Sequence, residues 1–252
     1  MKRPSIKLIL TALLLFVITA STIQGGSAFI GLLGISQNAK QIEDNWLPSV
    51  DAIHSMNTLI SDLRIAEATH ILATDPQVME KAETTMATLS AQLGELSATY
   101  EKLISSDAER QNWNKIQELS ALYMEHHNAL LEKSRENLNV EAAEIFSGKM
   151  REDFNAISDD LLTQVEMNVA GANQEAAHAS ATVSSVIAFT IAIFVVAFAV
   201  AVAGLVFVIK GVIKPLVTIT HRIKTLAEGD LRSDIPYTGR NDEIGMISGS
   251  VE

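Results

Sequence analysis

The sequence predicts an all-α protein with two membrane-spanning helices, an up-down-up-down four-helix bundle between them, and a helix–connector–helix segment after the second span. Hydrophobic residues make up 48% of the chain but aromatic residues only 5%, and only five prolines occur, which is typical of long helices. Two long apolar runs mark the spans. Between them, hydrophobic residues recur every three or four positions, which is the period of a helix and not of a strand.

The first apolar run covers residues 8–35 and follows a short segment, 1–7, that contains three cations and no acid. A cleaved signal peptide would use residues 8–20 as its apolar core, whereas an uncleaved anchor would use the whole run. We favour the anchor, because residues 29–33 (FIGLL) continue the apolar run past the positions where a signal peptidase would cut. Residues 1–7 are then the cytoplasmic N-terminus and 8–35 the first span.

The second apolar run is longer still. Residues 179–209 contain no charged residue, and since about 20 residues cross a hydrocarbon core, we assign the second span to 183–209. Cations precede the first span in residues 1–7, and they follow the second span at Lys210, Lys214, Arg222 and Lys224. The positive-inside rule then predicts that both termini are cytoplasmic and that residues 36–182 lie on the other side of the membrane.

Residues 36–182 contain helix start signals that divide them into four segments. Residues 74–76 (TDP) offer an N-cap followed by proline at the first helical position, and residues 106–109 (SDAE) form a capping box. A weaker signal at 137–139 (NLN) precedes two acids. The predicted helices are 36–74, 76–104, 107–137 and 139–182. Short connections make consecutive helices antiparallel, so these four segments form an up-down-up-down bundle.

The charge and composition of the chain restrict its partners. The formal net charge is −11, and residues 36–182 hold 10 basic and 24 acidic residues. This excludes nucleic acid as a partner, because phosphate binding requires a basic surface. The chain has no cysteine, which excludes disulfides, a thiol nucleophile and thiolate metal ligands. No phosphate-binding loop or nucleophile motif is recognisable, so we predict no catalytic residue and no cofactor.

Two Glu-x-x-His motifs, Glu67 to His70 and Glu175 to His178, each have the spacing of one half of a di-metal site. His70 lies about 50 Å beyond the first span at a rise of about 1.5 Å per residue, whereas His178 lies within one or two turns of the second span. The two motifs cannot share a metal ion, and we predict no metal site. His70 is then either a core histidine or part of a ligand site at its own level.

Six of the ten cations between the spans fall in the half of the bundle that is farther from the membrane. They are Arg64, Lys81, Lys133, Arg135, Lys149 and Arg151. Arg64 and Arg151 lie at nearly equal heights, and guanidinium groups suit bidentate capture of a carboxylate. We therefore expect a ligand site for a small organic anion at Arg64, His70 and Arg151. The alternative is a solvated face on which each cation pairs with a nearby acid, as Arg64 could with Glu67.

The segment after the second span has its own helical pattern. Its hydrophobic residues step by 4, 3, 4 and 3, which predicts one seam of a parallel helical bundle. The seam consists of Val212, Leu216, Ile219, Ile223 and Leu226. Gly229 can end this helix, residues 230–241 with Pro236 form an extended connector, and a second seam begins at Ile244.

This segment resembles a HAMP linker. The resemblance rests on Pro215, on LAEGDL at 226–231 and on DEIG at 242–245, and it covers residues 210–252, where the second helix is cut short. It implies a helix–connector–helix unit that forms a parallel coiled coil in a homodimer. The residues that it implicates in signal relay are Pro215, Leu216, Ile219, Ile223, Leu226, Gly229, Asp230, Leu231, Asp242, Glu243 and Ile244.

Residues 36–182 are similar, as a class, to the four-helix-bundle sensors of methyl-accepting chemotaxis proteins, and WLPSV at 46–50 and Leu63-Arg64 are the supporting residues. The resemblance implies a non-enzymatic chemoreceptor of the bacterial inner (cytoplasmic) membrane. Its homodimer would bind a small-molecule ligand and pass a displacement of the last bundle helix to the HAMP segment. A cytoplasmic histidine kinase and adaptor would then be partners through a domain beyond Glu252. The alternative is the sensor portion of a membrane-bound histidine kinase or diguanylate cyclase, and the sequence after Glu252 would distinguish the two.

Overall fold

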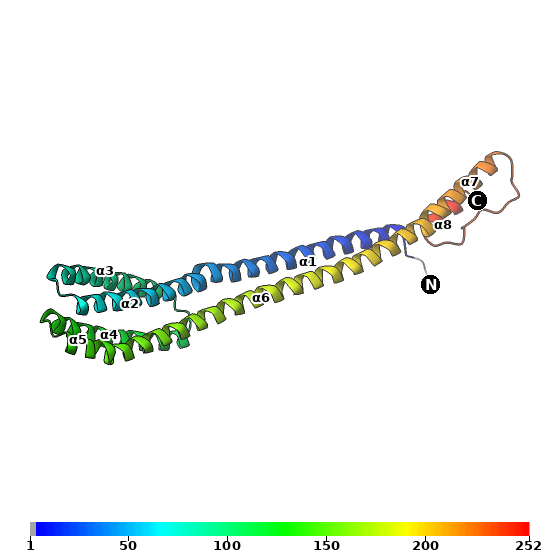
Figure 1. Ribbon diagram of the computed structural model, residues 1–252. Coiled ribbons are helices and arrows are strands. Elements are labelled where there is room, and N and C mark those ends of the chain that lie inside the picture. The colour runs from blue at the N-terminus through cyan, green and yellow to red at the C-terminus, as the bar shows by residue number, and fades with distance from the viewer. Residues whose placement is uncertain (1–3, 252) are drawn as a thin grey trace. The chain divides into compact units, whose positions relative to one another are not determined.

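The computed structural model describes residues 4–251, and all regular secondary structure in this part of the chain is helical. The all-α prediction is confirmed. The chain divides into two compact units: a bundle unit of residues 35–180, and a span unit made of the residues before and after it (Figure 1). Lys2 and Arg3, two of the cations predicted to flank the first span, and Glu252 lie outside the described residues.

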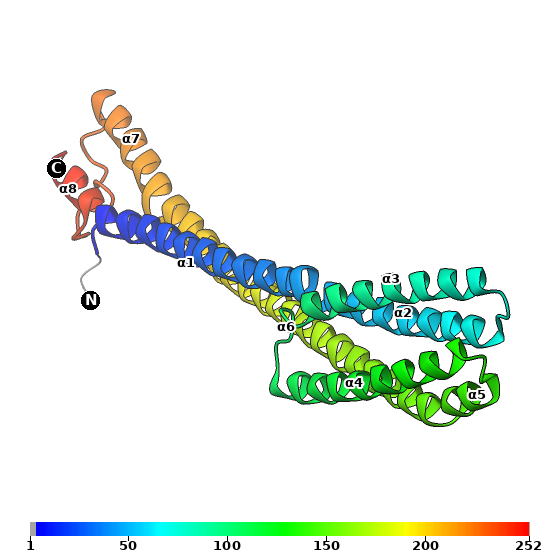
Figure 2. The same ribbon diagram turned by 90° about the vertical axis from the view of Figure 1, so that its left-hand side faces the viewer.

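The span unit contains two helices that are long and apolar enough to cross a membrane, α1 (Ile6–Gln41) and the second half of α6 (Lys149–Phe207). The two predicted spans are therefore confirmed by length and composition. The helices run side by side in both views (Figures 1 and 2). A Cβ atom on Gly31 would lie 2.5 Å from Cγ2 of Val186, so the missing side chain permits a close helix–helix contact.

The bundle unit is built from α2 (Leu47–Leu72), α3 (Pro76–Tyr100), α4 (Asp107–Arg135), α5 (Asn139–Ser147) and the first part of α6. A short π-helix, η1 (Ile42–Trp46), connects α1 to α2 without a break in the helical path. Figure 2 shows α2 and α3 as one antiparallel pair, with α4 and α5 alongside α6. The predicted four-helix bundle is confirmed.

The fourth predicted bundle helix, 139–182, is not continuous, because the structure interrupts it at Gly148. The helix α5 ends at Ser147, and the N–H of Gly148 donates to the Glu144 carbonyl at 2.9 Å before α6 begins at Lys149. A Cβ atom at position 148 would lie 2.8 Å from that carbonyl oxygen, so glycine suits this turn. The last bundle helix therefore starts after a separate nine-residue helix.

Both predicted helix caps are confirmed. The Asp75 side chain accepts a hydrogen bond from the N–H of Gln77 at 2.9 Å, and Pro76 occupies the first helical position of α3. At the start of α4, Ser106 accepts from the N–H of Glu109, and the Glu109 side chain accepts from the N–H of Ser106 in return. Each cap satisfies N–H groups that have no partner inside the helix, which fixes where the two helices begin.

The core of the bundle unit is continuous but uneven. Large side chains such as Ile53, Leu63, Met86 and Trp113 are buried among α2, α3, α4 and α6. The core-facing side of α3 is only partly covered, because Leu89, Leu93 and Leu96 are half-buried. The space between α3 and α4 is consequently less filled than the space between α2 and α3.

The linker segment in the span unit has the predicted helix–connector–helix form. A second π-helix, η2 (Val208–Ile213), continues α6 into α7 (Lys214–Ala227), and α8 (Glu243–Gly249) follows the connector. Gly229 has a φ of 102°, and the N–H of Asp230 donates to the Thr225 carbonyl at 3.1 Å, as in a Schellman cap. The prediction that Gly229 ends this helix is confirmed.

Candidate functional site

Arg64, on α2, holds the short helix α5 and the start of α6. Its guanidinium lies over the Phe146 ring at 4.0 Å and over the Phe154 ring at 5.2 Å, and Nη2 donates to the Phe146 carbonyl at 3.1 Å. Its Nη1 is buried and makes no well-formed hydrogen bond among the described residues, although the guanidinium lies near the Tyr123 hydroxyl. A buried charged donor without a well-formed hydrogen bond is uncommon in folded proteins and marks Arg64 as a candidate for ligand contact.

Arg151 and His70, the other two predicted ligand residues, differ in accessibility. Arg151 is exposed on α6, three residues before Phe154, which contacts Arg64, so the two arginines lie at the same end of the bundle. His70 is fully buried. Its Nδ1 lies 2.8 Å from Ser134 Oγ and its Nε2 lies 3.0 Å from Glu83 Oε1. His70 therefore has no free ring nitrogen, and its position is that of a core histidine that orients Glu83.

Glu83 connects α3 to α4 at this end of the bundle. Arg135 binds it with two hydrogen bonds, from Nε at 2.8 Å and from Nη2 at 2.9 Å. The hydrogen bond from Arg135 is the main cause that lowers the Glu83 pKa to about 2. Of the six distal cations, Arg135 is thus paired with an acid rather than free to bind a ligand.

A second polar cluster is buried one turn away. Glu67 is fully buried, and its carboxylate accepts a hydrogen bond from the Tyr123 hydroxyl at 2.6 Å and lies 2.6 Å from Nδ1 of His127. Burial, together with the nearby Glu67 carboxylate, raises the pKa of Tyr123. Among residues 4–251, no three histidine or acidic side chains are grouped so that they could hold a metal ion. Glu67 and His70 therefore belong to separate polar networks within the core.

The junction between α6 and α7 contains the predicted relay residue Pro215. Proline has no N–H, so it cannot donate to the carbonyl of Gly211, four residues earlier. Arg240 supplies a donor instead, because its Nη2 lies 3.0 Å from the Gly211 oxygen. The helix also widens here, since the N–H of Lys214 donates to the carbonyl of Ile209, five residues back.

Arg240 also positions Asp242, the first residue of the DEIG motif. The two side chains form a bidentate pair with Nε at 2.9 Å from Oδ1, and Asp242 in turn accepts from the N–H of Gly245 at 3.3 Å as the cap of α8. A Cβ atom on Gly245 would lie 1.9 Å from the Arg240 carbonyl oxygen. The glycine of the motif is therefore required by the close approach of the connector backbone.

Glu243, the second acid of the motif, contacts the beginning of the first span. Its carboxylate accepts hydrogen bonds from the backbone N–H groups of Ile6 at 2.8 Å and Lys7 at 3.4 Å. The first turn of a helix has N–H groups without intrahelical partners, and a carboxylate is favoured there. These backbone hydrogen bonds lower the pKa of Glu243. Within the span unit, α8 is thereby attached to the start of α1.

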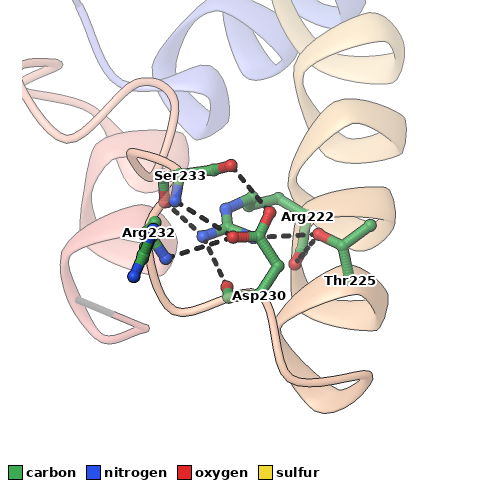
Figure 3. A network of polar contacts seen from close by, with 5 residues as sticks. All are labelled: Arg222, Thr225, Asp230, Arg232 and Ser233. Carbon is green, nitrogen blue, oxygen red and sulfur yellow. Dashed lines mark hydrogen bonds and ion pairs between the residues drawn. The ribbon is translucent and has the colours of Figure 1, made fainter.

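Arg222 fixes the start of the connector (Figure 3). This buried arginine donates to Thr225 Oγ1 at 2.9 Å, to the Asp230 carbonyl at 3.1 Å and to the Ser233 carbonyl. The Asp230 side chain accepts from the Ser233 hydroxyl, which is the main cause that lowers its pKa. In the sequence, Arg222 was notable only as a cation near the membrane, and nothing distinguished Arg240. An acid eight residues after Arg222 and another two after Arg240 were the available signals.

Several predicted relay residues have exposed side chains within one chain. Ile219 and Ile244 are buried, whereas Leu216 and Ile223 on α7 and Leu231 in the connector are exposed. Hydrophobic side chains of a predicted seam that remain uncovered in one chain are typical of a surface that packs against another helix.

A helical bundle joined by two apolar helices to a helix–connector–helix segment defines the architecture of a transmembrane sensory protein. The model of the four helix bundle sensory module for signal transduction matches residues 5–183, and the HAMP domain model matches residues 207–252. The first match covers more than half of the chain, so this protein belongs to the family of four-helix-bundle sensory modules. The predicted HAMP linker and the prediction of a chemoreceptor-type sensory transducer are confirmed.

A curated relative agrees with this assignment. The "Putative sensory transducer protein YvaQ" of Bacillus subtilis (strain 168) is 21% identical over 238 residues, which are 94% of this chain. The chain spans 42% of the length of that relative. The similarity therefore covers the sensor, the spans and the linker.

Proposed function

We propose that this chain is the sensory part of a chemoreceptor that detects a small organic anion outside the bacterial cytoplasmic membrane. The observation that carries the proposal is Arg64, whose buried Nη1 makes no well-formed hydrogen bond among the described residues while the rest of its guanidinium is fixed by Phe146 and Phe154. A carboxylate would satisfy this donor with a charge-assisted hydrogen bond. Arg151, exposed at the same end of the bundle, would supply a second cation.

The position of Arg64 suggests how the effect of ligand binding would be transmitted to the membrane. Arg64 contacts the carbonyl of Phe146 at the end of α5 and the ring of Phe154 in the first turns of α6. An anion that draws the guanidinium toward itself would alter both contacts and so bias the position of α6. Because α6 continues as the second span, this bias would reach η2 and α7. A ligand shifts such an equilibrium only by its differential affinity for the two arrangements.

We also propose that the receptor is a homodimer in which the exposed seam of α7 pairs with its copy. The exposed side chains of Leu216 and Ile223 support this, since two short helices bury too little apolar surface alone. The test is oxidation of membranes that contain Ile223→Cys, with Lys224→Cys on the adjacent face as the matched control. A disulfide-linked dimer of Ile223→Cys alone is expected, and equal linking of both variants, or of neither, would contradict the dimer.

The cytoplasmic signalling partner of the chain is also proposed. The HAMP segment would pass the signal to a cytoplasmic histidine kinase through an adaptor and a further domain. The name of the B. subtilis relative, a sensory transducer, favours this output over a histidine kinase or diguanylate cyclase fused to the same sensor. Sensors of this class are usually non-enzymatic, and we propose that this chain has no catalytic activity of its own.

The anion site is tested by calorimetric titration of the chain in lipid nanodiscs with a panel of small mono- and dicarboxylates. For the compound that binds, Arg64→Ala and Arg151→Ala should each weaken binding about tenfold or more, because each removes a charge-assisted contact. Lys102→Ala, at an exposed cation at the other end of the bundle, is the matched control and should leave binding unchanged. Unchanged binding after charge reversal by Arg64→Glu would overturn the site.

A further inference from the structure

The bundle unit contains a cavity of about 520 Å³ between α3 and α4 that the anion site does not use. Its inner wall is formed by side chains of α2 and α6, including Ile60 and Ile157, and by Trp113 of α4. Its outer edges are formed by small residues, Gly94 and Ser97 on α3 and Ser120 on α4. The volume falls within the range of about 300–1,000 Å³ that is usual for small-molecule sites.

Polar contacts at both ends of the cavity hold α3 and α4 apart at a fixed spacing. At one end, Arg135 of α4 binds Glu83 of α3 through two hydrogen bonds of 2.8 and 2.9 Å. At the other end, Glu101 at the end of α3 pairs with Arg110 and accepts from Nε1 of Trp113 at 2.7 Å. These two contacts lie about 27 Å apart along α3, at a rise of about 1.5 Å per residue. The helices are therefore joined at their ends, and the space between the two joints stays open.

The lining of the cavity determines which ligands it can hold. None of the described residues that line it carries a formal charge. A charged group would lose its hydration there without gaining a counter-ion, which costs several kcal/mol for an ion of this kind. The walls present the rings of Trp113 and Tyr123 and the thioethers of Met56 and Met124, groups that pack favourably against aromatic rings. The serine hydroxyls at the edge are the polar groups nearest to the opening.

We propose that this cavity is a second effector site of the sensor, and that its ligand is a neutral aromatic molecule of about two rings. An apolar hole of about 150 Å³ holds one benzene, so a cavity of this size has room for a larger ring system. This inference goes beyond the anion site, since it concerns a different place in the bundle and a ligand of opposite chemistry.

The cavity lies against α6, the helix that the anion site also contacts. Ile157 and Leu161 of α6 belong to its wall, and so does Tyr123, whose hydroxyl donates to the buried Glu67. A ligand that fills the space would press on α6 about one turn beyond Phe154, where Arg64 acts. Neutral and anionic effectors would then act on one helix from two adjacent positions.

The experiment uses the whole chain in lipid nanodiscs, with Trp46→Phe as the background so that Trp113 is the remaining tryptophan. The probe is 2-bromonaphthalene, whose heavy atom quenches an indole on contact. Saturable quenching of Trp113 is expected. Ser97→Leu and, separately, Gly94→Leu fill the cavity and should weaken saturable binding about tenfold or more. Circular dichroism confirms that each variant remains helical.

Two controls make the outcome decisive. Ala98→Leu adds the same bulk to an exposed position of α3 and should retain binding within about a factor of two. Quenching that rises linearly with probe concentration, and equally in all variants, would mean that the probe only partitions into lipid. That result would overturn the site. 6-Bromo-2-naphthoate carries a charge on the same ring system and should bind at least about tenfold more weakly in the cavity. Naphthoate that quenches Trp113 as tightly as 2-bromonaphthalene, in the Arg64→Ala variant as well as in the parent chain, would overturn the neutral character of the site.

Discussion

At the scale of single residues, Arg240 connects three parts of the linker. It donates to the carbonyl of Gly211, which Pro215 cannot satisfy because it has no N–H. It also binds the Asp242 carboxylate through Nε and Nη2, and its own carbonyl lies beside Gly245. The proline of the membrane junction and the DEIG motif of the second helix are thus joined through one side chain.

Replacing Arg240 should loosen the second helix of the linker. Arg240→Lys keeps the charge but cannot bind a carboxylate with a planar pair of donors, so the cap of α8 should weaken. Hydrogen exchange at the amides of Gly245 and Met246 should rise about tenfold in the chain held in nanodiscs. Arg232→Lys, where the structure records only a backbone contact, is the control and should leave this exchange unchanged. Equal exchange in both variants would show that Arg240 does not hold the cap.

The lowered pKa of Glu83 predicts that the stability of the bundle depends on pH. Its pKa in the folded chain is lowered from 4.5 to about 2, mainly by Arg135. A group with a lowered folded pKa contributes stability that is fully present above its unfolded value and is lost as pH falls toward the folded one. The thermal midpoint of the wild type should therefore exceed that of Glu83→Gln at pH 6, and the difference should shrink between about pH 4.5 and pH 2.

The measurement for Glu83 is tryptophan fluorescence during heating, with the chain in detergent micelles. Glu80→Gln, an exposed glutamate one turn earlier on α3, serves as the control and should follow the wild type at each pH. A midpoint difference between wild type and Glu83→Gln that stays constant down to pH 2 would exclude the ion pair as its source.

At the scale of elements, the bundle meets the first span through η1, the π-helix that ends at Trp46. A Cβ atom on Gly171 of α6 would lie 2.5 to 2.7 Å from three carbons of the Trp46 ring. The indole thus lies flat against the backbone of the helix that continues into the second span. A rigid ring in contact with a helix backbone transmits a displacement more directly than a flexible side chain could.

The change Gly171→Ala should therefore destabilise the bundle. The new methyl group cannot be accommodated without moving the indole, and overpacking of this kind costs about 1–3 kcal/mol. Denaturant unfolding in detergent measures the change. Gly94→Ala is the matched control, because a Cβ atom there meets nothing within 4 Å, and it should leave stability unchanged or raise it by up to about 1 kcal/mol through helix propensity. Equal effects of the two changes would contradict the packing of Trp46 on Gly171.

At the scale of the whole molecule, the features that could be predicted from the sequence are those that depend on residues close together in the chain. The two spans, the caps at Asp75 and Ser106 and the turn at Gly229 follow from composition or from residues within one helical turn. Contacts between distant segments were not predictable in this way. The pairing of Glu83 with Arg135 and of Arg240 with Gly211 depends on which helix faces which, and hydrophobic periodicity alone does not specify it.

The central claim is that the bundle senses on one side of a membrane and the HAMP segment responds on the other. The chain has no cysteine, so single cysteines report their side of the membrane directly. Gln92→Cys lies on the exposed face of α3, and Met246→Cys replaces a residue of α8 that is 76% exposed. With a membrane-impermeant maleimide, we predict that Gln92→Cys is labelled when the outer face of the cytoplasmic membrane is exposed and that Met246→Cys is labelled only after that membrane is opened. Labelling of both cysteines from the same side would contradict the account.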